Sequence, residues 1–305
     1  MKIQQVHKKS VSQDDAGMRL DNYLISNLKG VPRSKIYSII RKGEVRVNSK
    51  RYKPRQRIEE GDIVRIPPVE IKTGEAPKPR RQLIDLIKES FLFEDKSLLV
   101  IDKPIGIASH GGSGISLGLI EIVRQIDSTY KNIQLVHRLD KETSGCIVLA
   151  KKKSILREMH RLLRDHKVEK NYIAITQGKW EKKKIKVNLN LQKTIDSSGE
   201  KSIKVSYEGQ NSLSTFEEIT YNKGFSLVDC LLETGRTHQI RVHCNYLGHP
   251  IAGDKKYGDK EFNKRLIELG YRRMMLHASS IHFRDIGFSV KSKIPDEFNL
   301  LLDNI

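Results

Sequence analysis

The side chains best suited to chemistry gather in one stretch of nine residues, HRLDKETSG at 137–145. Asp140 lies there between Arg138 and Lys141, and an apolar, strand-like run follows at 146–150. Loops that are fixed on rigid strands commonly carry catalytic residues. Two neighbouring cations favour the ionised carboxylate, and an ionised carboxylate suits a nucleophile better than a general acid. The competing interpretation is that Asp140 caps a turn and pairs with Arg138, an ordinary role for an aspartate in a loop.

A second polar stretch, TGRTHQIRVH at 234–243, lies at a predicted strand-to-helix junction. Arg236 could meet Asp140 there as a bidentate partner, because a guanidinium offers two parallel N–H donors to a carboxylate. The alternative is a surface turn whose charges form ordinary ion pairs.

Tyr172 lies in a third candidate element, the strand-like run 168–175. A period of two places Tyr172 and Ala174 on one face of this strand, and Ile173 with Ile175 on the other. Such a tyrosine is ordinarily half-buried, so a functional role requires that its hydroxyl points into a cleft.

The sequence lacks the spacings that predict metal or phosphate-loop chemistry. Its ten His and three Cys form no His-Glu-x-x-His and no Cys-x-x-Cys motif. The glycine-rich loop at 110–114 lacks the Lys-Ser/Thr pair of a nucleotide-binding loop. We therefore predict no metal site, and we interpret the glycine loop as a simple flexible connection.

The composition favours a polyanionic partner. Lys and Arg number 56 against 37 Asp and Glu, which gives a net charge of +19. A basic surface gains affinity by releasing counterions from phosphates. A membrane is the rival polyanion, but no apolar run of roughly 18 residues is present. The first residues lack the apolar core of a signal peptide, and three scattered cysteines do not suggest a disulfide framework, so we expect a cytoplasmic protein without a membrane partner.

The N-terminal region, 1–68, is predicted to be a small domain of two helices and a small sheet. Residues 1–66 hold 16 Lys and Arg against 7 Asp and Glu, a net charge of +9. A module this basic is more often a reader of phosphate backbones than a merely solvated surface. The candidate side chains for contacts to such a backbone are Arg19, Arg33, Lys35, Lys42 and Arg46.

This region resembles the S4 RNA-binding domain over about 17–66. The resemblance is carried by RLDNYL at 19–24, PRS at 32–34, IRKGEVRVN at 40–48 and EGD at 60–62. It implies a module that places two helices against a small sheet and grips structured RNA. Residues 69–90 are expected to form a linker: the Pro-containing, charged part up to about 82 predicts a semi-extended chain, and the apolar spacing at 83–90 is compatible with the start of a helix. Residues 91–305 are expected to form a second domain.

The second domain resembles the RNA pseudouridine synthases of the large-subunit ribosomal RNA type. HRLDKETSG at 137–145, Lys170-x-Tyr172, TGRTHQIR at 234–241 and Leu-His-Ala at 276–278 occur in that order. The resemblance implies an α+β fold: a mixed, mostly antiparallel sheet crossed by a central cleft, with helices on its outer faces and a tethered S4 domain. Residues 181–210 match least well.

The resemblance also implies a reaction and residue roles. Uridine in RNA is isomerised by breaking the N1–C1′ bond and forming C5–C1′, without a cofactor or a metal. Asp140 would be the catalytic carboxylate, Arg236 would orient it, and Tyr172 would close over the uracil and transfer a proton. Substrate contacts would come from His137, Arg138 and Leu276; Arg138 would occupy the space that a flipped uridine leaves.

The expected substrate is 23S ribosomal RNA or an assembling large-subunit particle, bound by a monomer. Two alternatives stay open. The same chemistry could act on another ribosomal or transfer RNA, or the chain could be a non-catalytic RNA-binding assembly factor, although such a factor would have no need of Asp140, Tyr172 and Arg236.

Overall fold

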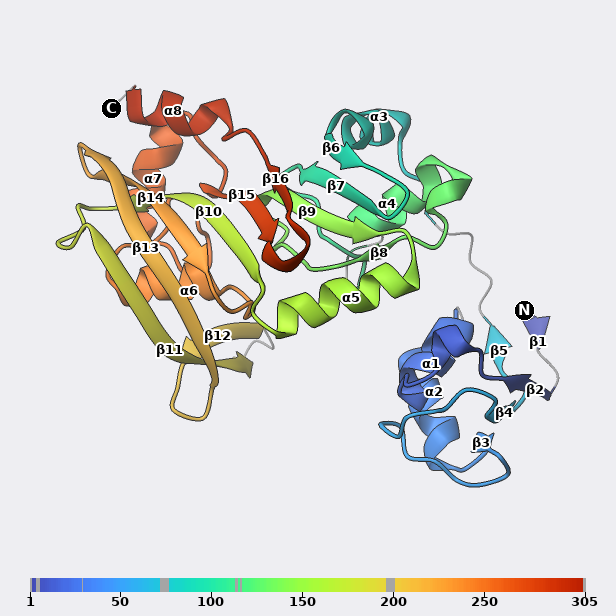
Figure 1. Ribbon diagram of the computed structural model, residues 1–305. Coiled ribbons are helices and arrows are strands. Elements are labelled where there is room, and N and C mark those ends of the chain that lie inside the picture. Colours follow the sequence, from blue (N-terminus) through green and yellow to red (C-terminus); the bar gives the residue numbers. More distant parts are fainter. Residues whose placement is uncertain are drawn as a thin grey trace. The chain divides into compact units, whose positions relative to one another are not determined.

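The computed structural model describes residues 2–3, 6–28, 30–71, 77–112, 115, 117–195 and 201–303 (Figure 1). The chain divides into two compact units, Met1–Pro77 and Lys78–Ile305. No helix within the described ranges is both long and apolar enough to cross a membrane.

The first unit packs two helices against a small sheet, as the sequence predicts. Its elements are β1 (Lys2–Ile3), β2 (His7–Ser10), a 3-10 helix (Gln13–Asp15), α1 (Leu20–Asn27), α2 (Arg33–Arg41), β3 (Arg46–Val47), β4 (Ile63–Ile66) and β5 (Glu70–Ile71). Strands β2, β4 and β3 form an antiparallel sheet in that order. Leu20 and Leu24 of α1 meet Ile36 and Ile40 of α2 in one buried apolar cluster. The unit therefore has a core of its own.

The predicted linker contains regular structure. Helix α3 (Arg81–Glu89) lies within 69–90 and belongs to the second unit, which begins at Lys78 rather than at 91. Leu83 and Ile87 are one helical turn apart and pack against the large core of that unit. A helix at 83–90 is compatible with the sequence, and its apolar stripe places it in the second unit rather than in a linker.

The second unit is built on one large mixed sheet, which confirms the predicted α+β class. Its strands are β6 (Phe91–Glu94), β7 (Leu98–Lys103), β8 (Gln134–Leu135), β9 (Ser144–Ala150), β10 (Val168–Gln177), β11 (Lys184–Ile195), β12 (Lys201–Val205), β13 (Gln210–Asn222), β14 (Phe225–Leu232), β15 (Leu276–Phe283) and β16 (Phe288–Lys291). The order is β12-β11-β13-β14-β10-β15-β9-β7-β6, with β16 on β15 and β8 on β9. Among the strand pairs of the described residues, only β15 with β9 is parallel.

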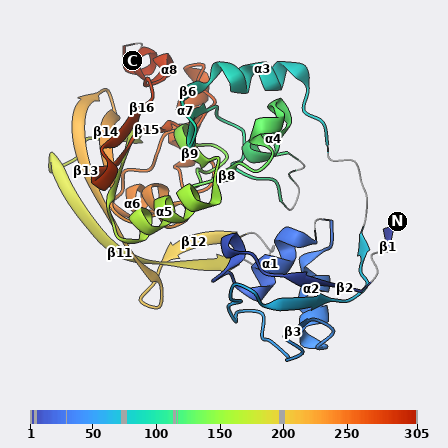
Figure 2. The same ribbon diagram turned by 45° about the vertical axis from the view of Figure 1, so that its right-hand side comes forward.

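Helices cover both faces of this sheet (Figures 1 and 2). Besides α3 they are α4 (Leu119–Ile126), α5 (Lys153–Arg164), α6 (Gln239–Tyr246), α7 (Lys260–Glu268) and α8 (Asp296–Asp303), with 3-10 helices at Ser128–Tyr130 and Arg284–Ile286. Apolar residues of α3, α4 and α6 share one core cluster, α5 contributes to a second, and α7 and α8 to a third.

Alternation along the strands assigns side chains to these cores. Tyr172 and Ala174 of β10 lie in the core shared by α4 and α6, whereas Ile173 and Ile175 lie with α7 and α8. The alternation predicted from the sequence is therefore confirmed. It turns Tyr172 toward the face of the sheet that carries α6.

The parallel seam between β9 and β15 requires a glycine at the end of the HRLDKETSG stretch. Gly145 has φ +112°, and a Cβ on it would lie 2.3 Å from the Ala278 carbonyl oxygen. Residues with a Cβ avoid that backbone region and could not approach so closely. Gly145 therefore lets β9 meet β15 directly after the Asp140 turn.

Candidate active site

A cleft of about 770 Å³ opens where the Asp140 turn faces the start of α6. Its wall combines residues 108–112, 135–141 and 235–241 with Tyr172 and Leu276. All six residues predicted for chemistry or substrate contact line it: His137, Arg138, Asp140, Tyr172, Arg236 and Leu276. The structure thus brings together positions that are far apart in the sequence.

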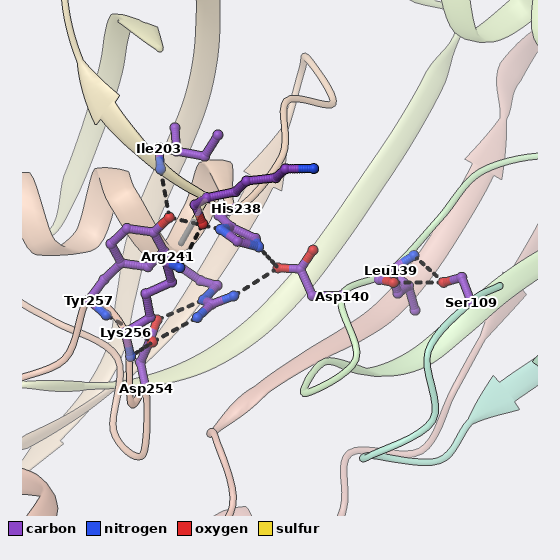
Figure 3. A network of polar contacts seen from close by, with 10 residues as sticks. Ser109, Leu139, Asp140, Ile203, His238, Arg241, Asp254, Lys256 and Tyr257 are labelled. Carbon is purple, nitrogen blue, oxygen red and sulfur yellow. Dashed lines mark hydrogen bonds and ion pairs between the residues drawn. The ribbon is translucent and has the colours of Figure 1, made fainter. Parts of the chain in front are cut away.

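Several backbone contacts fix the Asp140 turn. The buried Ser109 hydroxyl donates to the Leu139 carbonyl at 2.6 Å and accepts from the Leu139 N–H at 2.9 Å (Figure 3). On the other side of Asp140, the Lys141 carbonyl accepts from the Gly106 N–H at 2.9 Å and from Lys103 Nζ at 3.3 Å. The turn is therefore tied on both sides of the carboxylate to the segment that follows β7.

The arginine that meets Asp140 is Arg241, and the predicted pairing with Arg236 is wrong. Arg241 Nη1 donates to Asp140 Oδ2 at 3.2 Å. Arg236 precedes α6, and its Nε donates to the Asn211 carbonyl at 3.0 Å. Its backbone N–H donates to Gln239 Oε1 at 3.0 Å, which holds the turn against the start of the helix. Arg236 therefore lines the cleft beside the carboxylate without bonding to it.

Asp254, a residue that sequence reasoning did not assign to the site, anchors Arg241. Arg241 Nε and Nη2 donate to the two Asp254 oxygens at 2.7 and 2.8 Å. The N–H groups of Lys256 and Tyr257 donate to Asp254 Oδ1. Burial by itself would raise the pKa of Asp254, but these donors hold it below its usual value. One guanidinium edge is thus fixed, so Nη1 is aimed at Asp140.

The signal that could have identified Arg241 is its place in a buried helix. Its neighbours Ile240 and Val242 are buried, and Arg241 itself is only 7% exposed. A buried guanidinium requires acidic partners. Asp140 and Asp254 are those partners in the structure, whereas the exposed Arg236 does not require an acidic partner.

Tyr172 lines the cleft from β10 and is 7% exposed. Burial, followed by the negative charge of Asp140, raises the pKa of its hydroxyl. The phenol therefore stays protonated at neutral pH. This environment suits a proton donor or a packing ring, and it opposes a role as general base.

The three predicted substrate contacts differ in exposure. Leu276 is 3% exposed and begins β15 opposite Ala174. His137 accepts from the Val148 N–H through Nε2 at 3.2 Å, and burial, with the nearby Lys170 charge, lowers its pKa to about 3. His137 is therefore a neutral ring that ties the turn to β9, whereas Arg138 is exposed at the cleft.

The predicted RNA-binding side chains of the first unit fall into two groups. Arg33, Lys35 and Lys42 are exposed, and Arg46 is partly buried. Arg19 pairs with the buried Asp21, which also accepts from the Tyr37 hydroxyl at 2.8 Å. Arg19 therefore also contributes to the structure of α1.

A metal centre finds no support in the described ranges. Among those residues, no three His, Cys, Asp or Glu side chains gather where they could hold an ion. The three cysteines are unpaired and buried.

Both units of the chain match known protein families. Residues 97–246 match the RNA pseudouridylate synthase family, and residues 18–64 match the S4 domain. The chain is 47% identical over 282 residues to ribosomal large subunit pseudouridine synthase C of Pasteurella multocida, covering 92% of this chain and 86% of that protein. The protein of the same name from Escherichia coli (strain K12) is 46% identical over 282 residues, with 91% and 88% covered.

A solved structure extends the likeness to the fold. The human protein described as RNA pseudouridylate synthase domain containing 4 has a TM-score of 0.60 and 27% sequence identity, covering 72% of this chain and 93% of that one. The sequence relatives span both units of the chain, and the solved structure shares its sheet architecture. The chain therefore belongs to the RNA pseudouridine synthase family, whose members are isomerases that convert uridine in RNA to pseudouridine.

Proposed function

We propose that this pseudouridine synthase acts on the large-subunit (23S) ribosomal RNA, as free RNA or in an assembling particle. The proposal is supported by the names of relatives that are 46–47% identical across both units. It is also supported by the net charge of +19, which favours a long polyanion. The first unit, with its exposed Arg33, Lys35 and Lys42, grips the RNA and delivers it to the second.

The reaction is an isomerisation within one nucleotide. The N1–C1′ bond breaks, the uracil turns, C5 bonds to C1′, and the hydrogen on C5 is replaced by one on N1. Substrate and product have the same atoms and charge, so the balance requires no oxidant, reductant or energy source. The uridine must leave the base stack before the cleft can take it.

Asp140 is the catalytic carboxylate in this proposal. Its side chain is 27% exposed, and Arg241 holds its Oδ2. Among the described residues no hydrogen bond reaches Oδ1, so Oδ1 can approach the sugar or base while Arg241 stabilises the negative charge. This geometry, one oxygen held and one open to the cleft, is the observation that carries the proposal.

The remaining cleft residues act on the flipped uridine. Leu276 packs against the base, and the protonated Tyr172 lies beside it as proton donor. Arg138, exposed at the cleft, occupies the place that the uridine leaves in the RNA. Arg236 is free of the carboxylate and contacts the RNA backbone.

Pseudouridine mapping of total ribosomal and transfer RNA tests the proposal. Cells that lack the gene should lose modification at a small set of 23S sites, and the wild-type gene should restore it. A gene carrying Asp140→Asn, which keeps the shape of the side chain, should not restore it. Loss confined to transfer RNA or to 16S RNA would contradict the substrate. Restoration by Asp140→Asn would contradict the role of the carboxylate.

The same proposal places the protein in the cytoplasm as a monomer. Three buried cysteines without disulfides suit a reducing compartment, and one chain supplies every group of the cleft. Size-exclusion chromatography with light scattering should give one chain of 35.0 kDa. A dimer would contradict this part of the proposal.

A further inference from the structure

His238, between Arg236 and α6, has an unusual backbone. Its φ of 53° and ψ of 21° are left-handed, a region that residues other than glycine seldom occupy. Conformations of this kind persist where the surroundings enforce them, and they concentrate at functional sites. Figure 3 shows the His238 imidazole between Tyr257 and Asp140.

The two ring nitrogens of His238 meet different partners. Nδ1 lies 2.8 Å from the Tyr257 hydroxyl oxygen, and Nε2 lies 3.9 Å from Asp140 Oδ2. The Tyr257 and His238 rings meet edge to face, with centroids 5.5 Å apart. The imidazole therefore connects a tyrosine of the 254–257 segment to the catalytic carboxylate.

The hydrogen bonds of Tyr257 determine which nitrogen carries the proton. The Ile203 N–H of β12 donates to the Tyr257 oxygen at 3.0 Å, so the phenolic hydrogen remains available for donation. Burial keeps the pKa of His238 below its usual value, although Asp140 opposes this shift, so the ring is neutral at pH 7. A proton on Nδ1 would direct the Nε2 lone pair at the carboxylate. With the proton on Nε2, Tyr257 donates to Nδ1 and the Nε2–H points at Asp140.

We propose that His238 is a positioning residue for Asp140: Tyr257 fixes its Nε2–H tautomer, and this N–H directs the carboxylate together with Arg241. The inference rests on the proposed role of Asp140. Arg241 donates to Oδ2 at 3.2 Å, whereas His238 Nε2 faces the same oxygen from 3.9 Å, beyond hydrogen-bond distance. In this inference the Nε2–H closes on Oδ2 when RNA binds, and the two groups then restrict rotation of the carboxylate and keep Oδ1 toward the cleft.

A neutral donor fits the local charges better than a second cation. Arg241 and Lys256 supply positive charge near the ring, and Asp140 and Asp254 supply negative charge. An imidazolium would place a second full positive charge beside the carboxylate and make it a weaker nucleophile. A neutral N–H can orient the carboxylate without this loss of nucleophilicity.

Strand β12 binds Tyr257 and Lys256 on the side of Tyr257 that faces away from Asp140. Ile203 fixes the Tyr257 hydroxyl, and Lys256 Nζ donates to the Lys201 carbonyl at 2.7 Å. Strand β12 is thereby connected through Tyr257 and His238 to Asp140. Its role in this inference is to position Tyr257.

Single-turnover kinetics on a saturating RNA substrate separate positioning from binding. His238→Ala should slow isomerisation roughly 30-fold or more while leaving the Kd for RNA nearly unchanged, a loss typical of a misplaced reacting group. His238→Gln keeps an N–H donor and should recover part of the rate. The matched control is His282→Ala, because His282 also faces a carboxylate, Glu169, at 3.5 Å, but on the exposed end of β15. An unchanged rate for His238→Ala, or an effect on Kd alone, would overturn the proposal.

Nitrogen-15 NMR of histidine-labelled full-length protein tests the tautomer without RNA. The His238 signal should show a protonated Nε2 and an unprotonated Nδ1, and Tyr257→Phe should mix the two tautomers. A protonated Nδ1 in the wild type would refute the inference even in an active enzyme. An active Asp140→Asn variant would instead refute the proposed function while leaving the tautomer result intact, so the two failures are distinguishable.

Discussion

The two units of the molecule use their charges in opposite ways. In the cleft of the second unit, Arg241 is 9% exposed along its side chain and is bound by Asp140 and Asp254. In the first unit, Arg33, Lys35 and Lys42 are exposed on or beside α2. Among the described residues of the first unit, only the buried Asp21 carboxylate is held in a comparable way, by hydrogen bonds from Arg19 and Tyr37.

This difference reflects what each unit must do. Bond rearrangement requires groups whose geometry is set before the substrate arrives, in surroundings that exclude water. Attraction to an RNA backbone requires many charges that adjust to phosphates and release counterions. Substitutions at Arg241 and Tyr172, which lie at the Asp140 carboxylate, should therefore change rates, and substitutions in the first unit should change affinity and its dependence on salt.

The largest effect is expected for Arg241→Ala. The variant removes the partner of Asp140 and leaves Asp254 buried without its cation. Isomerisation should slow by roughly 10²–10³-fold, as when one preorganised donor is lost. The free energy of unfolding should fall by roughly 3–5 kcal/mol. Single-turnover kinetics and urea denaturation measure the two effects.

Arg236→Ala is the matched control for that variant, because Arg236 lines the same cleft without touching a carboxylate. It should preserve folding and mainly weaken RNA binding. If Arg236→Ala slowed catalysis as much as Arg241→Ala at saturating RNA, the assignment of Arg241 as the orienting arginine would be wrong.

Tyr172→Phe tests whether the cleft needs the hydroxyl or only the ring. Loss of a proton donor should slow isomerisation roughly 10²-fold, at the lower end of what general acid catalysis contributes, with the fold intact because the ring remains packed. Because burial raises the pKa of this hydroxyl above its usual value, Tyr172 should cause no loss of wild-type rate between neutral and mildly alkaline pH. A decline that follows ionisation of a tyrosine near neutral pH would contradict the raised pKa.

A triple variant of the first unit, Arg33→Gln with Lys35→Gln and Lys42→Gln, should leave the rate at saturating RNA unchanged. Its affinity should depend less on salt, and the slope of log K against log salt should flatten by roughly 0.7–0.9 for each phosphate that the variant no longer neutralises. Filter binding at several salt concentrations measures the slope. An unchanged slope would show that these three side chains do not touch the RNA.

The smallest effect concerns Lys170, which lines the cleft and whose pKa burial lowers to about 8. Above that pH a growing fraction of Lys170 is neutral in the free enzyme, so RNA affinity should weaken a few-fold as the pH rises from neutral through the pKa. Lys170→Met should bind less tightly at neutral pH and show a flatter profile. Parallel profiles for the two proteins would exclude Lys170 as the group responsible.

The sequence predicted the local parts of this site well because local patterns encode them. Alternation placed Tyr172 and Ala174 on one face of β10, and the apolar run after the Asp140 turn became β9. The family motifs identified residues that line one cleft. Each of these inferences depends on neighbours within a few positions along the chain.

The arginine that pairs with Asp140 could not be identified from such local patterns. Two arginines, five positions apart, were available in TGRTHQIR, and the one that bonds lies 101 residues from Asp140. The two arginines differ in burial: Arg241 lies in the buried helix α6, whereas Arg236 lies in the exposed turn before it. This difference depends on how α6 packs in the core. Ser109 was missed for the same reason, since its partner Leu139 lies 30 residues away. Asp254 lies only 13 residues from Arg241, but the two side chains follow no helical or strand spacing that would pair them.

The parallel seam between β9 and β15 has a mechanical consequence. Asp140 reaches the cleft from the strands on one side of this seam, and Arg241 from the helix that packs on β11–β13 at the other. Their ion pair thus spans two half-sheets that meet at Gly145 and Ala278. The separation of β9 from β15 sets the distance between the Asp140 carboxylate and the Arg241 guanidinium. Gly145→Ala would push the two strands apart at Ala278 and so weaken this ion pair without touching either residue.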